Sequence, residues 1–285
     1  MLRLLDKSTA RLDMGELGFS IPVAERFREL VRSPHGIIPV TGPTGSGKTT
    51  TLYSALRELN TDERNILTVE DPIEYELSGV GQMQIRPRIN LTFANCLRHL
   101  LRHDPDVIMV GEIRDPETAD MAIRAALTGH MVFSTLHTND SATAITRLLD
   151  MGVEPYLVSS SILAILAQRL VRVICPHCKE ETVVSERSGL ALGISGETVF
   201  VGKGCEECLN TGFRGRTSIG EFLEVNESIR ELIMQHASAE EIKRRAVANG
   251  MKTLRGDGVD KMRKGITTPE EVIRVTQDAP AVKSA

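Results

Sequence analysis

The hydrophobic and polar positions between residues 35 and 170 follow two alternating periods. Short, continuous apolar runs occur at 37–41, 66–70, 106–112 and 131–137. Between them lie stretches in which apolar residues recur every three to four positions, at 49–59, 93–103, 116–127 and 141–151. The runs predict buried strands, and the stretches predict amphipathic helices. Because strands alternate with helices, we expect βαβ units and a largely parallel sheet covered on both faces.

Residues that favour helix ends support these boundaries. Pro116 stands in the first turn of the 116–127 helix, and Gly129 and Gly152 follow the ends of two helices. In the tail, Ser238 and Thr268 are each followed three residues later by Glu, which is the capping-box pattern of a helix start. The tail is therefore predicted to be helical.

A glycine-rich loop separates the first predicted strand from the first predicted helix. Its sequence, GPTGSGKT, matches the phosphate-loop pattern G-x-x-x-x-G-K-[ST]. Glycines let backbone N–H groups converge on phosphate oxygens, and the N-terminus of the following helix adds partial positive charge. We expect Lys48 to reach the β- and γ-phosphates and the Thr49 hydroxyl to bind Mg²⁺. The predicted nucleotide-binding residues are Gly42, Pro43, Thr44, Gly45, Ser46, Gly47, Lys48, Thr49 and Thr50.

Acidic residues follow two of the predicted strands, at the sheet edge where the phosphate loop is expected. Glu112 closes one strand, and Glu70 closes another with Glu74 close behind it. A nucleoside triphosphatase needs one carboxylate near Mg²⁺ and one that orients the attacking water. Gly111 occupies the position of the usual Walker B aspartate, so we expect water-mediated contact with the metal. Glu70 and Glu74 are both candidates for the base, and a solvated charged turn is the alternative interpretation of this segment.

His137 ends a third predicted strand at the same edge of the sheet. A histidine in this place can sense the γ-phosphate or link the nucleotide site to a neighbouring subunit. Capping of the next turn is the alternative interpretation.

Four of the five cysteines fall in two C-x-x-C pairs, Cys175 with Cys178 and Cys205 with Cys208. Two such pairs supply four soft ligands that suit tetrahedral Zn²⁺. A closed four-cysteine site stabilises a segment that is too small to build its own core. A redox role is the weaker alternative, because no thioredoxin-like strand and helix surround either pair. Cys96 lies on the apolar face of a predicted helix, so we expect it in the core.

Bulk composition narrows the function classes. The chain has 285 residues, of which 41% are hydrophobic and 25% charged, with a formal net charge of -4. The acidic balance, 4% aromatic residues and zero Trp disfavour a nucleic-acid translocase. Charges near the N-terminus argue against a secretory signal, and the apolar run 162–167 is too short to span a bilayer. We therefore expect a cytoplasmic protein with no membrane span and no nucleic-acid partner.

Five sequence boxes occur in order: GPTGSGKTTTLYSAL, ILTVEDPIEY, LRHDPDVIMVGEIRD, ALTGHMVFSTLHTND, and the pairs CPHC and CEEC. Together they resemble the secretion superfamily ATPases, specifically the type II secretion E protein and the related ATPases of type IV pilus assembly. The resemblance runs from about residue 2 to 277. Retraction motors of the same superfamily generally lack the cysteine pairs, so these pairs favour the secretion or extension branch.

This resemblance implies an ATP-hydrolysing homo-hexamer, peripheral to the inner membrane, that drives type II secretion through inner-membrane platform and recruiting proteins. The implied roles are ATP and Mg²⁺ binding for the loop with Lys48, Walker B acid for Glu112, water activation for Glu70 or Glu74, and γ-phosphate contact for His137. Arginines that reach across subunits come, in this family, largely from the domain before the core. Type IV pilus assembly and a nucleotide-gated scaffold with little activity in isolation are the alternatives.

The expected fold class is α/β, with a RecA-like P-loop core, a mostly parallel sheet, a small four-cysteine zinc module and a C-terminal helical region. We expect residues 1–34 to be the stub of a preceding domain and 35–170 to be the ATPase core. Residues 171–218 are expected to form the zinc module, and 219–285 the C-terminal helical domain.

Overall fold

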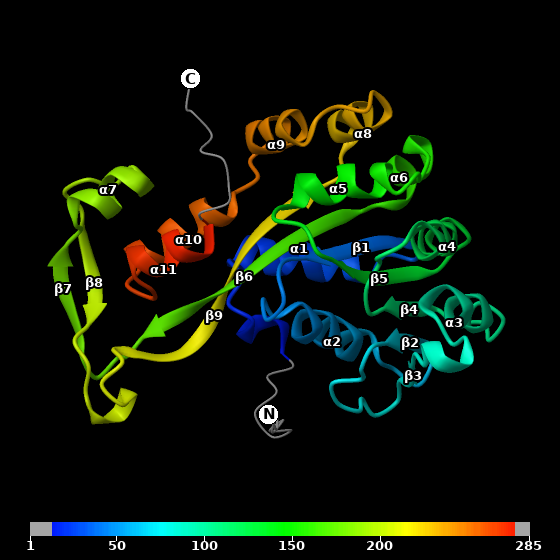
Figure 1. Ribbon diagram of the computed structural model, residues 1–285, viewed down its shortest axis with the longest axis horizontal. Coiled ribbons are helices and arrows are strands. Elements are labelled where there is room, and N and C mark those ends of the chain that lie inside the picture. The colour runs from blue at the N-terminus through cyan, green and yellow to red at the C-terminus, as the bar shows by residue number, and fades with distance from the viewer. Residues whose placement is uncertain (1–12, 277–285) are drawn as a thin grey trace.

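A seven-stranded sheet forms the centre of the computed structural model, which describes residues 13–276 (Figure 1). The strand order is β3-β2-β4-β5-β1-β6-β9. Neighbouring strands from β3 to β6 are parallel, and β6 pairs with β9 in antiparallel fashion. The mostly parallel sheet expected from the sequence is confirmed. Its strands are β1 (Gly36–Thr41), β2 (Ile66–Glu70), β3 (Gly81–Gln84), β4 (Val107–Val110), β5 (Met131–Leu136), β6 (Ala164–Ile174) and β9 (Phe213–Glu224).

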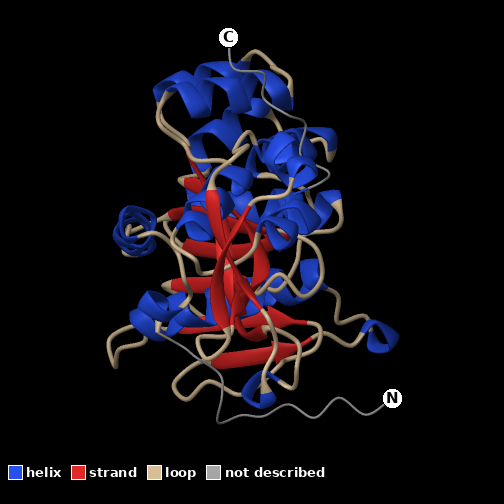
Figure 2. Ribbon diagram, turned by 90° about the vertical axis from the view of Figure 1, so that its left-hand side faces the viewer, coloured by secondary structure: helices blue, strands red, loops and turns tan. Residues whose placement is uncertain are grey.

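Helices cover both faces of this sheet, because successive strand residues point to opposite sides. In β4, Val107 and Met109 pack into one hydrophobic cluster, whereas Ile108 and Val110 pack into the other. Figure 2 shows the strands lying between helices. The first face is covered by α1 (Ile21–Val31) and α2 (Lys48–Leu59). The second face is covered by α3 (Phe93–Leu100), α4 (Pro116–Leu127), α5 (Ser141–Asp150) and α6 (Pro155–Ser161).

The segment before β1 packs on the first face of the sheet. A short 3-10 helix, η1 (Met14–Glu16), is capped by the side chain of Asp13 and precedes α1. Phe27 and Val31 of α1 are fully buried in the same cluster as Leu56 of α2. The first twelve residues of the expected N-terminal stub, and 277–285 of the expected C-terminal domain, lie outside the described residues.

A long antiparallel ribbon leaves the sheet and carries a smaller one. The ribbon consists of β6 and β9, with an irregularity in register between Arg172 and Ile174. At its far end, β7 (Lys179–Val183) and β8 (Thr198–Gly202) form a two-stranded sheet beside α7 (Glu186–Leu192) and the 3-10 helix η3 (Glu206–Cys208). Figure 1 places this piece at the end of the molecule opposite β3 and β4. Both ribbon strands run across the expected boundaries near 170 and 218, and the four-part division of the chain remains a prediction.

The C-terminal region is helical, as the sequence predicts. Its elements are α8 (Glu227–Met234), α9 (Ala239–Ala248), α10 (Leu254–Arg263) and α11 (Pro269–Thr276). The hydroxyls of Ser238 and Thr268 accept hydrogen bonds from the N–H groups of Glu241 and Glu271, which confirms both predicted helix starts. Helix α8 packs on α6 and α9 on α5, whereas α10 and α11 lie along the ribbon (Figure 1).

Some element bounds differ from the sequence prediction. The helix expected over 93–103 ends at Leu100, where the His103 N–H bonds the Leu100 carbonyl in a tighter turn. The strand expected over 106–112 covers Val107–Val110. Among the elements that were not predicted are β3, α6 and the long strands β6 and β9. Strand β3 is a four-residue edge strand with two glutamines, and α6 is only seven residues long.

Candidate functional site

The phosphate loop joins β1 to α2, and three of its glycines have backbone angles that other residues rarely adopt. Gly42, Gly45 and Gly47 have φ values of 151°, 79° and 90°. A Cβ atom on Gly42 would lie 2.5 Å from the Gln168 carbonyl oxygen, and one on Gly47 would lie 2.8 Å from Gln168 Nε2. The loop therefore requires glycine at both positions. Helix α2 begins directly after it, so the free N–H groups of the first helical turn face the loop.

The ammonium group of Lys48 lies inside this loop. Its Nζ donates hydrogen bonds to the carbonyl oxygens of Gly42 at 2.8 Å and Pro43 at 3.0 Å. Burial, and then the charge of the Arg169 guanidinium, lower the pKa of Lys48 to about 8. The Ser46 hydroxyl is buried and has no hydrogen-bond partner among the described residues. A buried cation and an unpaired hydroxyl in a glycine-rich loop are groups that a phosphate would complement.

Glu112 follows β4 and lines the same cleft as the loop. Its Oε2 lies 2.7 Å from Arg114 Nε and 3.3 Å from His137 Nε2, and its side chain is 10% exposed. A Cβ atom on Gly111 would lie 3.2 Å from the Cα atom of Glu70 on the neighbouring strand. A side chain at position 111 would therefore lie tightly against the β2 backbone, and the glycine found where the usual Walker B pattern has aspartate avoids this contact.

The carboxylate of Glu70 is buried and held by three neutral donors. Its Oε1 accepts hydrogen bonds from Thr68 Oγ1 at 2.6 Å and from Gln82 Nε2 at 3.0 Å. Its Oε2 accepts a hydrogen bond from the Tyr53 hydroxyl. Burial, and then this hydrogen bond, raise the pKa of the Tyr53 phenol, so that it stays a donor. These contacts leave the Glu70 carboxylate little freedom to orient a water molecule.

Glu74 lies four residues further along, in the loop that follows β2. It is half-buried and lines the cleft. Unlike that of Glu70, its carboxylate has no hydrogen-bond donor within residues 13–276. The neighbouring Tyr75 ring packs edge-on against Tyr53, with 4.7 Å between ring centroids, and so fixes the start of this loop. Of the two candidate bases, Glu74 is the one free to turn toward a ligand.

One cleft of about 410 Å³ brings most of the predicted site residues together. Gly42, Pro43 and Ser46 belong to the loop but are not among the residues that line the cleft. The predicted residues that line it are Thr44, Gly45, Gly47, Lys48, Thr49, Thr50, Glu70, Glu74, Glu112 and His137.

Tyr75, Arg114 and Arg216 are among the residues of the cleft lining that were not predicted as site residues from the sequence. Tyr75 and Arg114 stand beside predicted acids in the chain, so a search for further groups in the acidic boxes could have found them. Arg216 comes from β9, more than a hundred residues after the acids, and reaches the cleft because β9 pairs with β6. No local sequence signal marks it.

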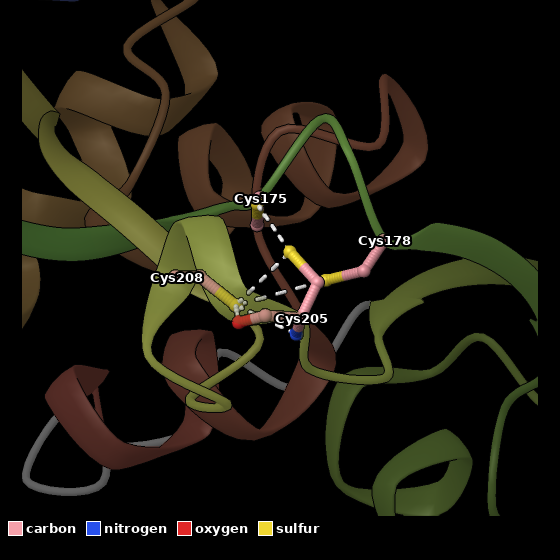
Figure 3. Close-up of side chains that lie close together, drawn as sticks. All are labelled: Cys175, Cys178, Cys205 and Cys208. Carbon is pink, nitrogen blue, oxygen red and sulfur yellow. Dashed lines mark hydrogen bonds between the residues drawn. The ribbon is translucent and has the colours of Figure 1, made fainter.

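The four paired cysteines converge on one point at the far end of the ribbon (Figure 3). The Sγ atom of Cys205 lies 3.8 Å from that of Cys175 and 3.7 Å from that of Cys208. The Sγ atoms of Cys178 and Cys208 lie 3.9 Å apart. A tetrahedral zinc site with Zn–S bonds of about 2.3 Å places sulfur atoms about 3.8 Å from one another. The four thiols are thus spaced as a closed zinc site requires.

Backbone geometry supports the four-cysteine cluster. The N–H groups of Gly204 and Gly212 donate hydrogen bonds to the Sγ atoms of Cys178 and Cys208, at 3.3 Å and 3.2 Å. Such donors stabilise thiolates, which are the form that binds metal. A Cβ atom on Gly202 would lie 2.0 Å from the Gly212 carbonyl oxygen, so the two chain segments meet only because both residues are glycine.

Two further sequence predictions concern Cys96 and the length of apolar helices. Cys96 is fully buried in the hydrophobic cluster under α3 and α4, as expected of a core residue. None of the helices within the described part of the chain is long and apolar enough to cross a bilayer.

Comparison with known proteins agrees with this architecture. The model of the family described as "Type II/IV secretion system protein" matches residues 1–274. The chain is 54% identical over 281 residues to the type II secretion system protein E of Aeromonas hydrophila, covering 98% of this chain and 56% of that protein. It is 50% identical to the type IV pilus assembly ATPase PilB of Thermus thermophilus, covering 97% of this chain and 32% of that protein.

A solved structure shares the fold. The pilus retraction motor PilT with bound ADP is similar with a TM-score of 0.71 and 30% identity, covering 95% of this chain and 68% of that chain. The chain spans about half the length, or less, of the curated relatives that it matches.

Proposed function

Because the chain belongs to the type II/IV secretion system protein family, we propose that it hydrolyses ATP to drive type II protein secretion. The observation that carries this proposal is the cleft that Glu74, Glu112 and His137 line together with Lys48 and the rest of the phosphate loop. A loop of backbone donors, a buried cation and separate carboxylates are the groups that phosphoryl transfer to water requires.

The loop and Lys48 bind the triphosphate. Backbone N–H groups of residues 42–49 and the N-terminus of α2 surround the phosphates, and Ser46 offers its unpaired hydroxyl. The Lys48 ammonium exchanges the carbonyls of Gly42 and Pro43 for the β- and γ-phosphate oxygens. Because this cation is already buried, it stabilises charge on the transferred phosphate without first having to shed water.

The Thr49 hydroxyl and the Glu112 carboxylate are oxygen donors of the kind that suits Mg²⁺, and both line the cleft. Mg²⁺, when bound there, would neutralise charge on the β- and γ-phosphates. Since Gly111 supplies no carboxylate, Glu112 would hold the ion through water. His137 contacts the same Glu112 oxygen and so keeps this carboxylate in place beside the γ-phosphate.

Glu74 is the residue to which we assign activation of the attacking water. Glu74 lines the cleft, and its carboxylate has no hydrogen-bond donor in the described part of the chain, whereas the Glu70 carboxylate is held by Tyr53, Thr68 and Gln82. Glu70 then supports the floor of the cleft.

The four cysteines would bind one structural Zn²⁺ per chain. When bound, the metal supplies folding energy to a segment whose own hydrophobic cluster is small. The four-part division at 34, 170 and 218 belongs to the same proposal, with the zinc module placed at the end of the β6–β9 ribbon.

In this proposal the protein works as a cytoplasmic homo-hexamer at the inner membrane, attached through platform and recruiting proteins. The family resemblance supports this arrangement. The 50% identity to PilB favours pilus assembly as the second candidate function. To separate secretion from pilus assembly, this chain is put in place of the matching segment of the Aeromonas hydrophila protein, and the export of exoproteins is assayed. A segment from a pilus motor would not restore export.

Substitution of Lys48 tests hydrolysis itself. Lys48→Ala should lower the rate of phosphate release from ATP by about a hundredfold or more. The matched control is Lys252→Ala, which removes an exposed lysine paired with Asp260 outside the cleft. If Lys48→Ala is folded and hydrolyses ATP as fast as the unaltered protein, the assignment of the cleft is wrong. Absence of hydrolysis in the unaltered protein, with ATP still bound, would favour a nucleotide-gated scaffold.

A further inference from the structure

A second group of buried charges lies where the start of α5 meets β9 and α9. Lys243 of α9 places its Nζ 2.9 Å from Asp140 Oδ2 and 3.4 Å from Glu221 Oε2. The side chains are 7%, 11% and 0% exposed, so the group is almost completely removed from water. Such charges are costly to bury unless each is paired and hydrogen-bonded, and here each of them is.

Asp140 has two tasks in this group, one for each carboxylate oxygen. Its Oδ1 caps the N-terminus of α5 by accepting a hydrogen bond from the Thr143 N–H at 2.8 Å, and it also accepts one from the Thr143 hydroxyl. Its Oδ2 is left for Lys243. The helix cap therefore explains only one half of the Asp140 contacts, and the other half ties the start of α5 to a helix 103 residues later in the chain.

Glu221 anchors the group to the sheet. Its Oε1 accepts hydrogen bonds from the N–H of Ser141 at 3.0 Å and from the Ser141 hydroxyl at 2.6 Å. Its Oε2 faces Lys243 and the N–H of Leu254 at the start of α10. The Lys243 ammonium and the Glu221 carboxylate together thus join the first turn of α5, strand β9 and the two helices α9 and α10.

The other end of the same turn reaches the nucleotide cleft. Thr138 is hydrogen-bonded to Thr41 at the end of β1. The two hydroxyl oxygens lie 2.7 Å apart, and the Thr138 N–H donates to the Thr41 hydroxyl oxygen at 2.9 Å. The Asn139 carbonyl accepts a hydrogen bond from Arg169 at 2.8 Å. His137, three residues before Asp140, contacts Glu112. The turn of residues 137–140 is therefore held by β1, the strand before the phosphate loop, on one side and by Lys243 on the other.

We propose that Lys243 is a positioning residue for hydrolysis: by pairing with Asp140 it fixes the turn that presents His137 to Glu112. The inference rests on the proposed ATPase function, since it assigns to the C-terminal region a part in that same site. It also means that the place of α9 sets the place of His137, so that displacement of α9 by a partner would alter the cleft.

Lys261 shows what a buried lysine with a purely structural role looks like in this protein, and so serves as a comparison for Lys243. Lys261 of α10 is equally buried, with its side chain 8% exposed, and pairs with Asp257 at 2.6 Å. It also donates a hydrogen bond to the Ser218 carbonyl of β9. Lys261 thus fastens a C-terminal helix to the same ribbon strand, but its contacts do not include the turn 137–140. Loss of Lys261 should affect folding stability without moving His137.

The test compares Lys243→Met and Asp140→Asn with the control Lys261→Met. Asparagine keeps an oxygen for Thr143 and so keeps the helix cap, which leaves a testable variant if Lys243→Met does not fold. We expect kcat for ATP to fall about tenfold in both test variants, because a small misplacement of a positioned group has effects of this size. KM should change less than about twofold, since the phosphate loop is intact. Lys243→Arg should recover part of the loss, and Lys261→Met should keep kcat.

A readout without nucleotide separates this inference from the proposed function. The ring resonances of His137, identified by their loss in His137→Gln, should shift in Lys243→Met and Asp140→Asn but not in Lys261→Met. If they stay in place in all folded variants, or if Lys261→Met lowers kcat as much as Lys243→Met, the positioning role is wrong. If the unaltered protein shows no hydrolysis but His137 still shifts, the proposed function fails while the link from Lys243 to His137 stands.

Discussion

The Tyr53 hydroxyl of α2 donates a hydrogen bond to the Glu70 carboxylate at the end of β2. The contact joins the helix that follows the phosphate loop to the strand that carries the acidic box. Since Thr68 and Gln82 occupy the other carboxylate oxygen, Glu70 acts as a fixed brace between these elements. Because Glu70 is fixed in this way, we assign it a structural role and assign activation of the attacking water to Glu74.

Substitutions of the two glutamates should therefore have different effects. Glu74→Gln removes the proposed base and should lower kcat for ATP hydrolysis by about a hundredfold or more, with the fold unchanged. Glu70→Gln weakens the contacts to buried donors and should lower the free energy of unfolding by about 1–2 kcal/mol while kcat falls less than tenfold. Phosphate release and urea denaturation measure the two effects. The reverse pattern would assign the base to Glu70.

The affinity for ATP should fall as the pH rises above about 8. Burial, and then Arg169, lower the pKa of Lys48 to about 8 in the protein without nucleotide. The triphosphate binds the ammonium form, so binding above this pH must first return a proton to Lys48. We expect Kd to rise by up to about tenfold per pH unit between pH 8 and 10. Titration of a fluorescent ATP analogue measures it, and Lys48→Met should lose this part of the pH dependence.

Metal analysis tests the four-cysteine cluster. The purified protein should contain about one Zn²⁺ per chain, and Cys208→Ser should lose it together with about 5 °C or more of Tm. Cys96→Ala is the matched control, because it removes a buried cysteine outside the cluster and should keep the metal. A folded protein whose zinc content and Tm do not change in Cys208→Ser contradicts the site.

Acid should weaken the ion pairs of Glu271, which contacts Arg172 of the ribbon and Arg274 of its own helix α11. Burial disfavours the charged form of Glu271, but the side chains of Arg274 and Arg172 lower its pKa to about 2. A lowered pKa in the folded state means that the ion pairs stabilise the protein above about pH 4.5 and lose this contribution as the pH falls toward 2. Glu271→Gln should be less stable at pH 7 by about 2–3 kcal/mol, and the difference should shrink between pH 5 and 3. Urea denaturation at each pH checks this, and a gap that does not depend on pH contradicts it.

The sequence predicted the strands and helices that local periodicity determines. The alternation of Val107, Ile108, Met109 and Val110 between two clusters is the physical reason, because a strand buried on both faces is a continuous apolar run. The four cysteines could also be predicted, since two C-x-x-C pairs bring their ligands to one metal wherever they fold.

The difference between Glu70 and Glu74 could not be predicted from the sequence. Both acids follow the same strand, and what separates them is the set of donors that folding brings to Glu70 from α2 and β3. Lys243 was missed for a similar reason: its position on an amphipathic helix is ordinary, and its partner Asp140 lies 103 residues earlier. Contacts between distant segments decide roles that residue type and local spacing leave open.

Substitution of Glu112 tests the central claim, hydrolysis in the cleft, most directly. Glu112→Gln keeps the shape of the side chain and removes the charge that Arg114 and His137 contact. Phosphate release and ATP binding should be measured on the same sample. We predict that the variant binds ATP with nearly unchanged affinity but hydrolyses it at least about tenfold more slowly. A variant that binds and hydrolyses ATP as the unaltered protein does would contradict the account.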